Sequence, residues 1–178
     1  MSSYCVLLWL ICAANCIPLL IHQSVDGTYS FNRSWAEFKV GFNDSTGNYW
    51  LGNDLLHQLT KEARYKLRCL VQGRSNSVVY VATYGTFLVG SESSNYTFRV
   101  AHYYGSAGDA MSYHNGMMFS TYDRDNDLDT GGNCAEYHGG GFWYNNCYHA
   151  GVTVMTGQGG DFMWGSRALQ WAIMLLTC

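Results

Sequence analysis

Apolar and β-branched residues alternate or run together in two neighbouring segments, residues 64–72 and 77–84. This pattern predicts two β-strands, and Gly73 to Asn76 supply turn residues for a hairpin between them. The same kind of pattern continues through residues 83–104. The chain therefore predicts an antiparallel meander in this region.

Helical signals are short and lie in the first third of the chain. Residues 35–38 predict one short helix. Asn53 or Asp54 is expected to cap a second helix that continues through His57 and Leu59, because Asn and Asp are favoured N-cap residues.

Residues 4–21 form the only long apolar run, and Asn15 and Pro18 interrupt it. Its apolar stretch ending in small residues is typical of a secretory signal, although no basic residue precedes it. A run of about 18 residues could just span a bilayer, but Asn and Pro disfavour a stable spanning helix. We interpret residues 1–22 as a signal peptide or apolar leader, with membrane attachment only if it stays uncleaved.

The 178 residues are 48% hydrophobic and carry a net charge of −3 without a basic run. A chain of this size can bury the core of one domain, and its charge argues against nucleic acid as a partner. Its 14 Tyr, 20 Gly and 6 Trp suit aromatic-packed loops and short strands. No GxSxG, phosphate-loop, HExxH or CxxC motif occurs, which argues against an enzyme and against a zinc site.

Residues 113–149 combine two cysteines and a triple glycine with four alternating aspartates, Asp123, Asp125, Asp127 and Asp129. Carboxylates two residues apart in a curling loop can converge on calcium, whereas without a cation they repel each other. The sixth and twelfth loop positions lack the Gly and Glu of an EF-hand. An irregular calcium loop is one interpretation, and a solvated acidic loop is the other.

Three N-glycosylation sequons, at Asn32, Asn43 and Asn95, support export when they are taken together with the leader. An even number of cysteines follows the leader, as expected in an oxidising compartment. These cysteines are Cys69, Cys134, Cys147 and Cys178.

Several blocks in order resemble one family. They include DGTYSFNRSWAEFKVGF from Asp26, NYWLGNDLLHQLT from Asn48, and SYHNGMMFSTYDRDNDLDTGGNCAEY followed by FWYNNC. These blocks are similar to the fibrinogen C-terminal domain, the fold of ficolins, tachylectins, tenascins and angiopoietins. The resemblance implies an α+β domain over residues 26–178, with a central antiparallel sheet, short helices and a long calcium-binding loop. The family's N-terminal subdomain has no matching block, and the C-terminal part is shortened.

The resemblance also implies a calcium site. Asp125 and Asp127 would supply side chains, and Asp129 and Gly131 backbone carbonyls. One extra residue in the doubled Gly131-Gly132 leaves the register of the carbonyls open by one position.

Two disulfides are expected. The resemblance implies a Cys134–Cys147 bridge. Because Cys69 and Cys178 each end an apolar, strand-like run, and because the family's last strand inserts into the central sheet, we also predict a Cys69–Cys178 bridge. Two free buried thiols are the alternative.

A pocket that binds acetyl groups in ficolins and tachylectins would fall beside the second cysteine. Its expected residues include a cis Asn146–Cys147 peptide, with His138, Tyr148 and His149 at or near the positions of the family's rings. The cage of rings is altered here relative to the family. The remaining residues of note are interpreted as core or loop hydrogen-bonders rather than ligands: Phe142, Trp143, Tyr144, His102 and His114.

The predicted function is a secreted, calcium-binding, lectin-like glycoprotein that recognises acetylated carbohydrates in innate defence. The alternative is an extracellular adhesion or signalling domain that binds a protein, with a vestigial acetyl pocket. Assembly into a homo-oligomer is left open.

Overall fold

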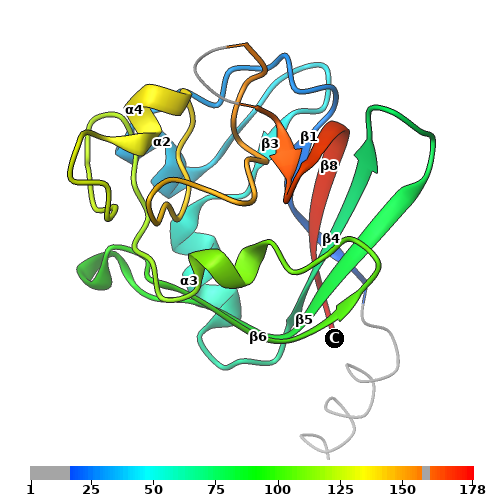
Figure 1. Ribbon diagram of the computed structural model, residues 1–178. Coiled ribbons are helices and arrows are strands. Elements are labelled where there is room, and N and C mark those ends of the chain that lie inside the picture. The colour runs from blue at the N-terminus through cyan, green and yellow to red at the C-terminus, as the bar shows by residue number, and fades with distance from the viewer. Residues whose placement is uncertain (1–16, 158–160) are drawn as a thin grey trace, which may run out of the picture.

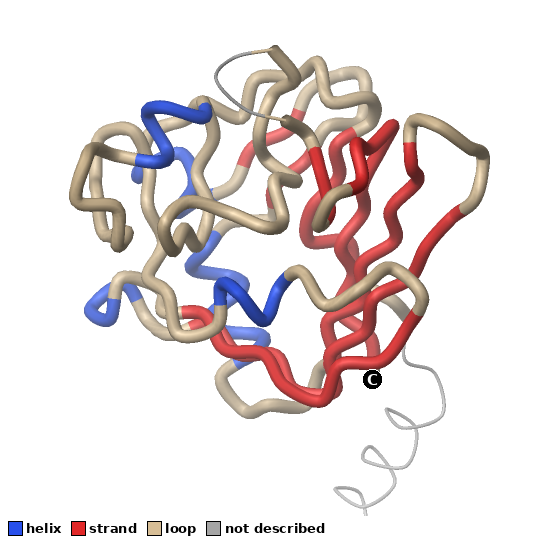
Figure 2. The backbone as a smooth tube through the Cα atoms, viewed as in Figure 1, coloured by secondary structure: helices blue, strands red, loops and turns tan. Residues whose placement is uncertain are grey.

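The computed structural model describes residues 17–157 and 161–178, and Figure 1 shows their arrangement. Strands gather on one side of the molecule, while loops and short helices make up most of the other (Figure 2). The elements in chain order are β1 (Leu19–Ser24), α2 (Trp35–Val40), β2 (Phe42–Asn43), β3 (Tyr49–Trp50), α3 (Asn53–Thr60), β4 (Lys66–Gly73), β5 (Val79–Val89), η1 (Glu92–Ser94), β6 (Phe98–Gly105), η2 (Met111–His114), α4 (Cys134–His138), β7 (Met163–Trp164) and β8 (Arg167–Thr177).

The strands of the described residues form one sheet in the order β2-β3-β1-β8-β4-β5-β6, with β7 paired to β8. Strand β8 lies between β1 and β4, so the last strand inserts into the centre of the sheet, as the resemblance implies. Strands β4 and β5 form the predicted hairpin, with Leu67 opposite Tyr84 and Gln72 opposite Val79. Strand β6 continues the meander beside β5.

Alternate side chains of β4 point to opposite faces of the sheet, and the two faces differ in burial. Leu67, Cys69 and Val71 are fully buried in the core. Arg68 and Leu70 point to the opposite face, because successive side chains of a strand alternate, and they stay exposed or half-buried. The core therefore lies between one face of the sheet and the loops that cover it.

Strand β1 overlaps the end of the predicted leader. Leu19 lies opposite Leu176 in β8, and Ile21 is buried. Residues 19–22, which we assigned to the leader, therefore belong to the central sheet, and that boundary is wrong. The earlier part of the predicted leader lies outside the described residues. Within the described part of the chain, no helix has the length and apolar character needed to cross a bilayer.

Helix α2 forms as predicted and begins with a capping box. Ser34 Oγ accepts a hydrogen bond from the N–H of Glu37 at 3.3 Å, and Glu37 Oε2 accepts one from the N–H of Ser34 at 2.9 Å. The buried side chains of the helix are Trp35 and Phe38. The Phe38 ring packs edge-on to Trp50 at 5.3 Å, so the amphipathic turn is fixed against an aromatic core.

Helix α3 forms, but neither predicted residue caps it. The N-cap is Gly52, which offers no side chain. Asn53 instead accepts a hydrogen bond from Trp50 Nε1 at 3.1 Å, and Asp54 accepts one from the Tyr96 hydroxyl. Both polar side chains therefore bond elsewhere, Asn53 to a residue just before the helix and Asp54 to a residue distant in the chain.

The predicted Cys69–Cys178 bridge is wrong. Cys69 is a free, buried thiol opposite Met174, whereas Cys178 takes part in a disulfide and follows Thr177. Four residues along a strand span about 13 Å. Two cysteines whose Cα atoms lie more than about 7 Å apart cannot form a disulfide without backbone movement. The register of β4 against β8 therefore rules out the bridge.

Candidate functional site

Three aspartates curl the acidic loop through the same local bond. Asp125 Oδ1 accepts the N–H of Asp127 at 3.1 Å, Asp127 Oδ1 accepts that of Asp129 at 2.8 Å, and Asp129 Oδ1 accepts that of Gly131 at 3.1 Å. Such bonds to the second residue onward are Asx turns, which hold a chain in a tight bend. The four residues of the predicted calcium set thus lie in one curled segment.

The first aspartate of the series has a different task. Asp123 Oδ1 accepts the N–H of Trp35 at 2.9 Å and the hydroxyl of Thr121 at 2.7 Å. The neighbouring Arg124 places its guanidinium carbon 4.0 Å from the centre of the Trp35 ring. Asp123 and Arg124 therefore attach the loop to helix α2, and Asp123 is not a member of the carboxylate pair described next.

Asp125 and Asp127 form a carboxylate pair that suits a cation. Burial raises the pKa of Asp127 above its ordinary value, and the nearby charge of Asp125 adds to this effect. Among the described residues, no ion pair joins either carboxylate to a basic side chain. A divalent cation would offset their repulsion, so these two residues fit the implied calcium.

Cys134 and Cys147 form the disulfide that the resemblance implies, with their Cα atoms 5.4 Å apart. Cys134 begins helix α4, whose N-terminus is capped by the side chain of Asn133. A carboxylate oxygen of Asp129 lies within 4.8 Å of both sulfurs. Because these sulfurs are bonded to each other, they are not thiolate ligands, and the group is not a metal site.

A pocket of about 500 Å³ opens beside this disulfide. The predicted site sets lack four of its residues, Gly132, Asn133, Glu136 and Tyr137, although their place close to Cys134 in the sequence was a usable signal. The pocket contains two carboxylates and no Lys or Arg side chain. Its walls are formed by Asp129, Gly131, Gly132, Asn133, Glu136, Tyr137, His138 and Cys147.

The expected cis peptide is not present, since every peptide bond between described residues, Asn146–Cys147 included, is trans. The trans bond leaves the carbonyl of Asn146 where the Tyr113 hydroxyl donates to it at 2.7 Å. The carbonyl of Cys147 accepts the N–H of Asn145 at 2.9 Å. Hydrogen bonds on both sides therefore hold this segment in its trans form.

The other residues predicted for the acetyl pocket separate in space. The Tyr148 ring meets His138 edge-on at 4.8 Å, so it supports a residue of the pocket wall. His149 stacks on Tyr113 with ring centres 3.8 Å apart and is not among the lining residues. Of the predicted ligand set, only His138 and Cys147 line the pocket.

His114 anchors the segment that follows Cys147. Its Nδ1–H donates to the carbonyl of Trp143 at 2.8 Å, and its Nε2 accepts the N–H groups of His149 and Ala150 at 3.2 and 3.1 Å. Burial lowers the pKa of His114 to about 4, so the ring is neutral at pH 7. His114 is a buried hydrogen-bonder, as the sequence predicted.

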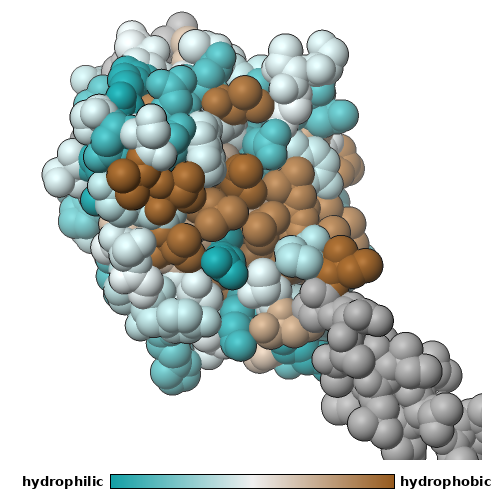
Figure 3. Space-filling view, turned by 90° about the vertical axis from the view of Figure 1, so that its right-hand side faces the viewer, coloured by the Kyte–Doolittle hydropathy of each residue, from teal (hydrophilic) through white to brown (hydrophobic). Residues whose placement is uncertain are grey.

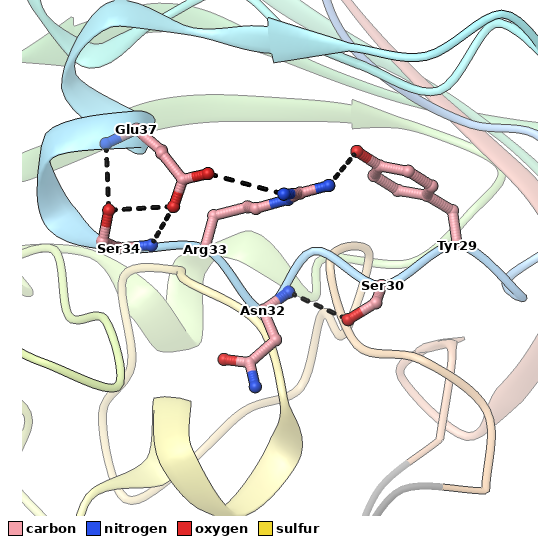
Figure 4. Close-up of polar contacts among 6 residues, drawn as sticks. All are labelled: Tyr29, Ser30, Asn32, Arg33, Ser34 and Glu37. Carbon is pink, nitrogen blue, oxygen red and sulfur yellow. Dashed lines mark hydrogen bonds and ion pairs between the residues drawn. The ribbon is translucent and has the colours of Figure 1, made fainter.

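The predicted glycosylation sites differ in accessibility. Asn32 is exposed, and Figure 4 shows its carboxamide pointing away from the neighbouring polar contacts. Asn43 is exposed as well. Asn95 is half-buried, and its Nδ2 donates to Asn126 Oδ1 at 3.1 Å while its Oδ1 accepts from Arg124 at 2.6 Å. The Asn95 carboxamide is thus already engaged within the fold.

Comparison with known proteins decides the family. Residues 11–173 match the family described as fibrinogen beta and gamma chains, C-terminal globular domain. The chain belongs to this family. Within it, the mouse angiopoietin-related protein 2 is 36% identical over 170 residues, which cover 88% of this chain and 34% of that protein. The human fibrinogen alpha chain is 40% identical over 159 residues, covering 81% of this chain and 18% of that protein. The fibrinogen-type chain thus spans about a third or less of these relatives.

Solved structures confirm the α+β fold of this fibrinogen C-terminal domain. The fibrinogen-like globe domain of human ANGPTL2 is 35% identical with a TM-score of 0.79, and the match covers 89% of this chain and 79% of that one. Lamprey fibrin D-dimer in complex with the peptide Gly-His-Arg-Pro-amide is 30% identical with a TM-score of 0.78, covering 89% and 60%.

Proposed function

We propose that this fibrinogen C-terminal domain is an extracellular recognition module that binds a segment of a protein partner in the pocket beside Cys134–Cys147. The observation that carries the proposal is the pocket itself, which has two carboxylates and an aromatic side chain in its wall. Support comes also from the relatives, since one of them, lamprey fibrin, is described in complex with a peptide.

The chemistry of the pocket favours a cationic group of the partner. Asp129 and Glu136 offer carboxylates, and Tyr137 is exposed beside them. A free amino terminus or an arginine can donate charge-assisted hydrogen bonds to carboxylates and can stack on a tyrosine ring. An uncharged acetyl group would leave both carboxylates without an opposite charge.

Calcium would support this site rather than form its binding surface. The carboxylates of Asp125 and Asp127 would hold the ion, and backbone carbonyls at Asp129 and Gly131 would complete the ligand set. Once bound, the ion supplies positive charge that keeps the loop curled. Because Asp127 accepts a hydrogen bond from the N–H of Cys134, a fixed loop would also hold the start of α4 in place.

The test is a pair of calorimetric titrations of the purified chain in calcium. One uses Gly-His-Arg-Pro-amide, which carries both an amino terminus and an arginine, and the other uses N-acetylglucosamine. We expect the peptide to bind and the sugar not to bind. Glu136→Gln should weaken peptide binding by about tenfold or more, the loss typical of one charge-assisted hydrogen bond.

Glu62→Gln is the matched control, because Glu62 pairs with Arg64 away from the pocket and should leave binding unchanged. If the sugar binds in calcium and the peptide does not, the proposal of a protein-binding module is wrong, and recognition of acetylated carbohydrate takes its place.

A further inference from the structure

The face of the sheet that points away from the core carries a patch of apolar side chains. Leu70 of β4 lies opposite Val81 of β5 and Ile173 of β8, and Leu175 lies beside them opposite Leu20 of β1. Partners in an antiparallel pair point to the same face, and all five of these side chains are only half-buried. We call these residues the outer sheet face. Figure 3 shows apolar side chains gathered over this side of the molecule.

The charged side chains in the strands that form the outer sheet face have one sign. The chain has 13 acidic residues, yet no strand of the described residues contains one. Lys66 and Arg68 lie at one end of the face, and neither forms a salt bridge within the described part of the chain. The face is therefore apolar and positive on a protein whose net charge is negative.

Both cations line a single hollow at the end of the apolar patch. The hollow has a volume of about 300 Å³, and Thr83 and Tyr104 add hydroxyl-bearing side chains to its wall. Arg68 lies opposite Thr83 in β5 and opposite Leu175 in β8, so the hollow is continuous with the apolar residues. A ligand can therefore place carboxylates in the hollow and apolar groups on the patch at the same time.

We propose that the outer sheet face is a second docking surface, and that its occupant is an acidic amphipathic segment of a protein partner. The apolar side of the segment covers Leu70, Ile173 and Leu175, and its carboxylates reach Lys66 and Arg68. Charge complementarity selects this occupant, because two oppositely charged surfaces attract while like charges disfavour the wrong partner. A second copy of this chain would bring two basic faces together.

The test uses the full chain in calcium and two synthetic helices of about 14 residues, or about four turns. Both helices have the same leucines on one side, and the other side carries glutamate in one peptide and lysine in the other. Fluorescence anisotropy of the labelled helices reports binding. The wild-type chain should bind the glutamate helix at least about tenfold more tightly than the lysine helix.

Two pairs of substitutions locate the binding. Lys66→Glu with Arg68→Glu should remove the preference for the glutamate helix. Leu70→Thr with Ile173→Thr should weaken the binding of both helices, and threonine is a residue that strands accommodate well. The matched control is Lys61→Glu with Arg99→Glu, which makes the same charge change at exposed positions lining a different hollow and should leave the preference intact.

Four results would overturn the proposal. The first two are that neither helix binds and that the two helices bind equally well. In the third, the control pair removes the preference as completely as the Lys66 and Arg68 pair does. In the fourth, the wild-type chain sediments as a dimer that Leu70→Thr with Ile173→Thr converts to a monomer, in which case the outer sheet face is occupied by a second copy. The pocket beside the disulfide carries none of these substitutions, so peptide binding there is judged separately.

Discussion

Asp127 Oδ2 accepts a hydrogen bond of 2.8 Å from the backbone N–H of Cys134. The same carboxylate belongs to the pair that suits a cation, and the same cysteine belongs to the disulfide beside the pocket. The acidic loop and the pocket wall are therefore directly connected. A change that disorders the acidic loop should therefore also alter the pocket wall, and the reverse should hold.

Calcium should raise the melting temperature of this domain, because an ion that binds only the folded state stabilises it. At a hundred times the dissociation constant the gain is about 3 kcal/mol, or roughly 5–10 °C for a domain of this size. Asp125→Ala with Asp127→Ala should remove the gain in thermal melts with and without chelator. Asp123→Asn is the control, since Asp123 holds α2 and should leave the gain intact. A full gain in the double variant would refute the calcium assignment.

Removing the disulfide should destabilise the domain, because the unfolded chain gains conformational entropy when the loop is no longer closed. Cys134→Ser with Cys147→Ser frees a loop with a sequence separation of 13, for which the chain-entropy model gives a loss of about 3 kcal/mol. Urea unfolding measures it. The calcium gain should shrink as well, because Asp127 bonds to the N–H of Cys134. Cys69→Ala, at a thiol outside any disulfide, should keep the full calcium gain.

The domain should lose stability in mild acid because of two buried histidines. Burial lowers the pKa of both His22 and His114 to about 4, below the ordinary 6.5. The unfolded chain therefore binds more protons between these values, and the free energy of unfolding should fall as pH drops from about 6.5 to about 4. Each histidine contributes up to roughly 3 kcal/mol to this loss.

The check is chemical denaturation across that pH range. His114→Gln should be less stable at pH 7 but show a shallower decline in acid, because one buried titrating group is gone. His102→Asn, at an exposed position, should decline like the wild type. An equally steep decline in His114→Gln would show that His114 is not responsible.

Glycans should be found at Asn32 and not at Asn95. A glycan on Nδ2 of Asn95 would replace its bond to Asn126, whereas the Asn32 carboxamide is exposed. When the chain is expressed through a eukaryotic secretory pathway, Asn32→Gln should remove one glycan by mass spectrometry. Asn95→Gln should leave the glycan mass unchanged and lower the melting temperature, because it disturbs the contact with Arg124. A glycan lost only from Asn95→Gln would contradict this assignment.

The sequence alone was sufficient to predict those features that depend on residues close together in the chain. Alternation predicted the β4–β5 hairpin, and the segment from Trp35 to Phe38 predicted a helical turn. The aspartate series also predicted a curled acidic loop, because each Asx turn involves residues only two positions apart. Family blocks then supplied the fold and the Cys134–Cys147 pairing.

Tertiary structure decided whatever depends on residues far apart in the chain. The register of β8 against β4 separates Cys69 from Cys178, and no local pattern contains that register. Asp54 accepts a hydrogen bond from the hydroxyl of Tyr96 rather than capping its helix, because a residue so distant in the chain comes near only once the core has formed. The accessibility of Asn95, the composition of the pocket and the uniform charge of the outer sheet face have the same origin. Each follows from which distant side chains meet when the strands pair and the loops close over them.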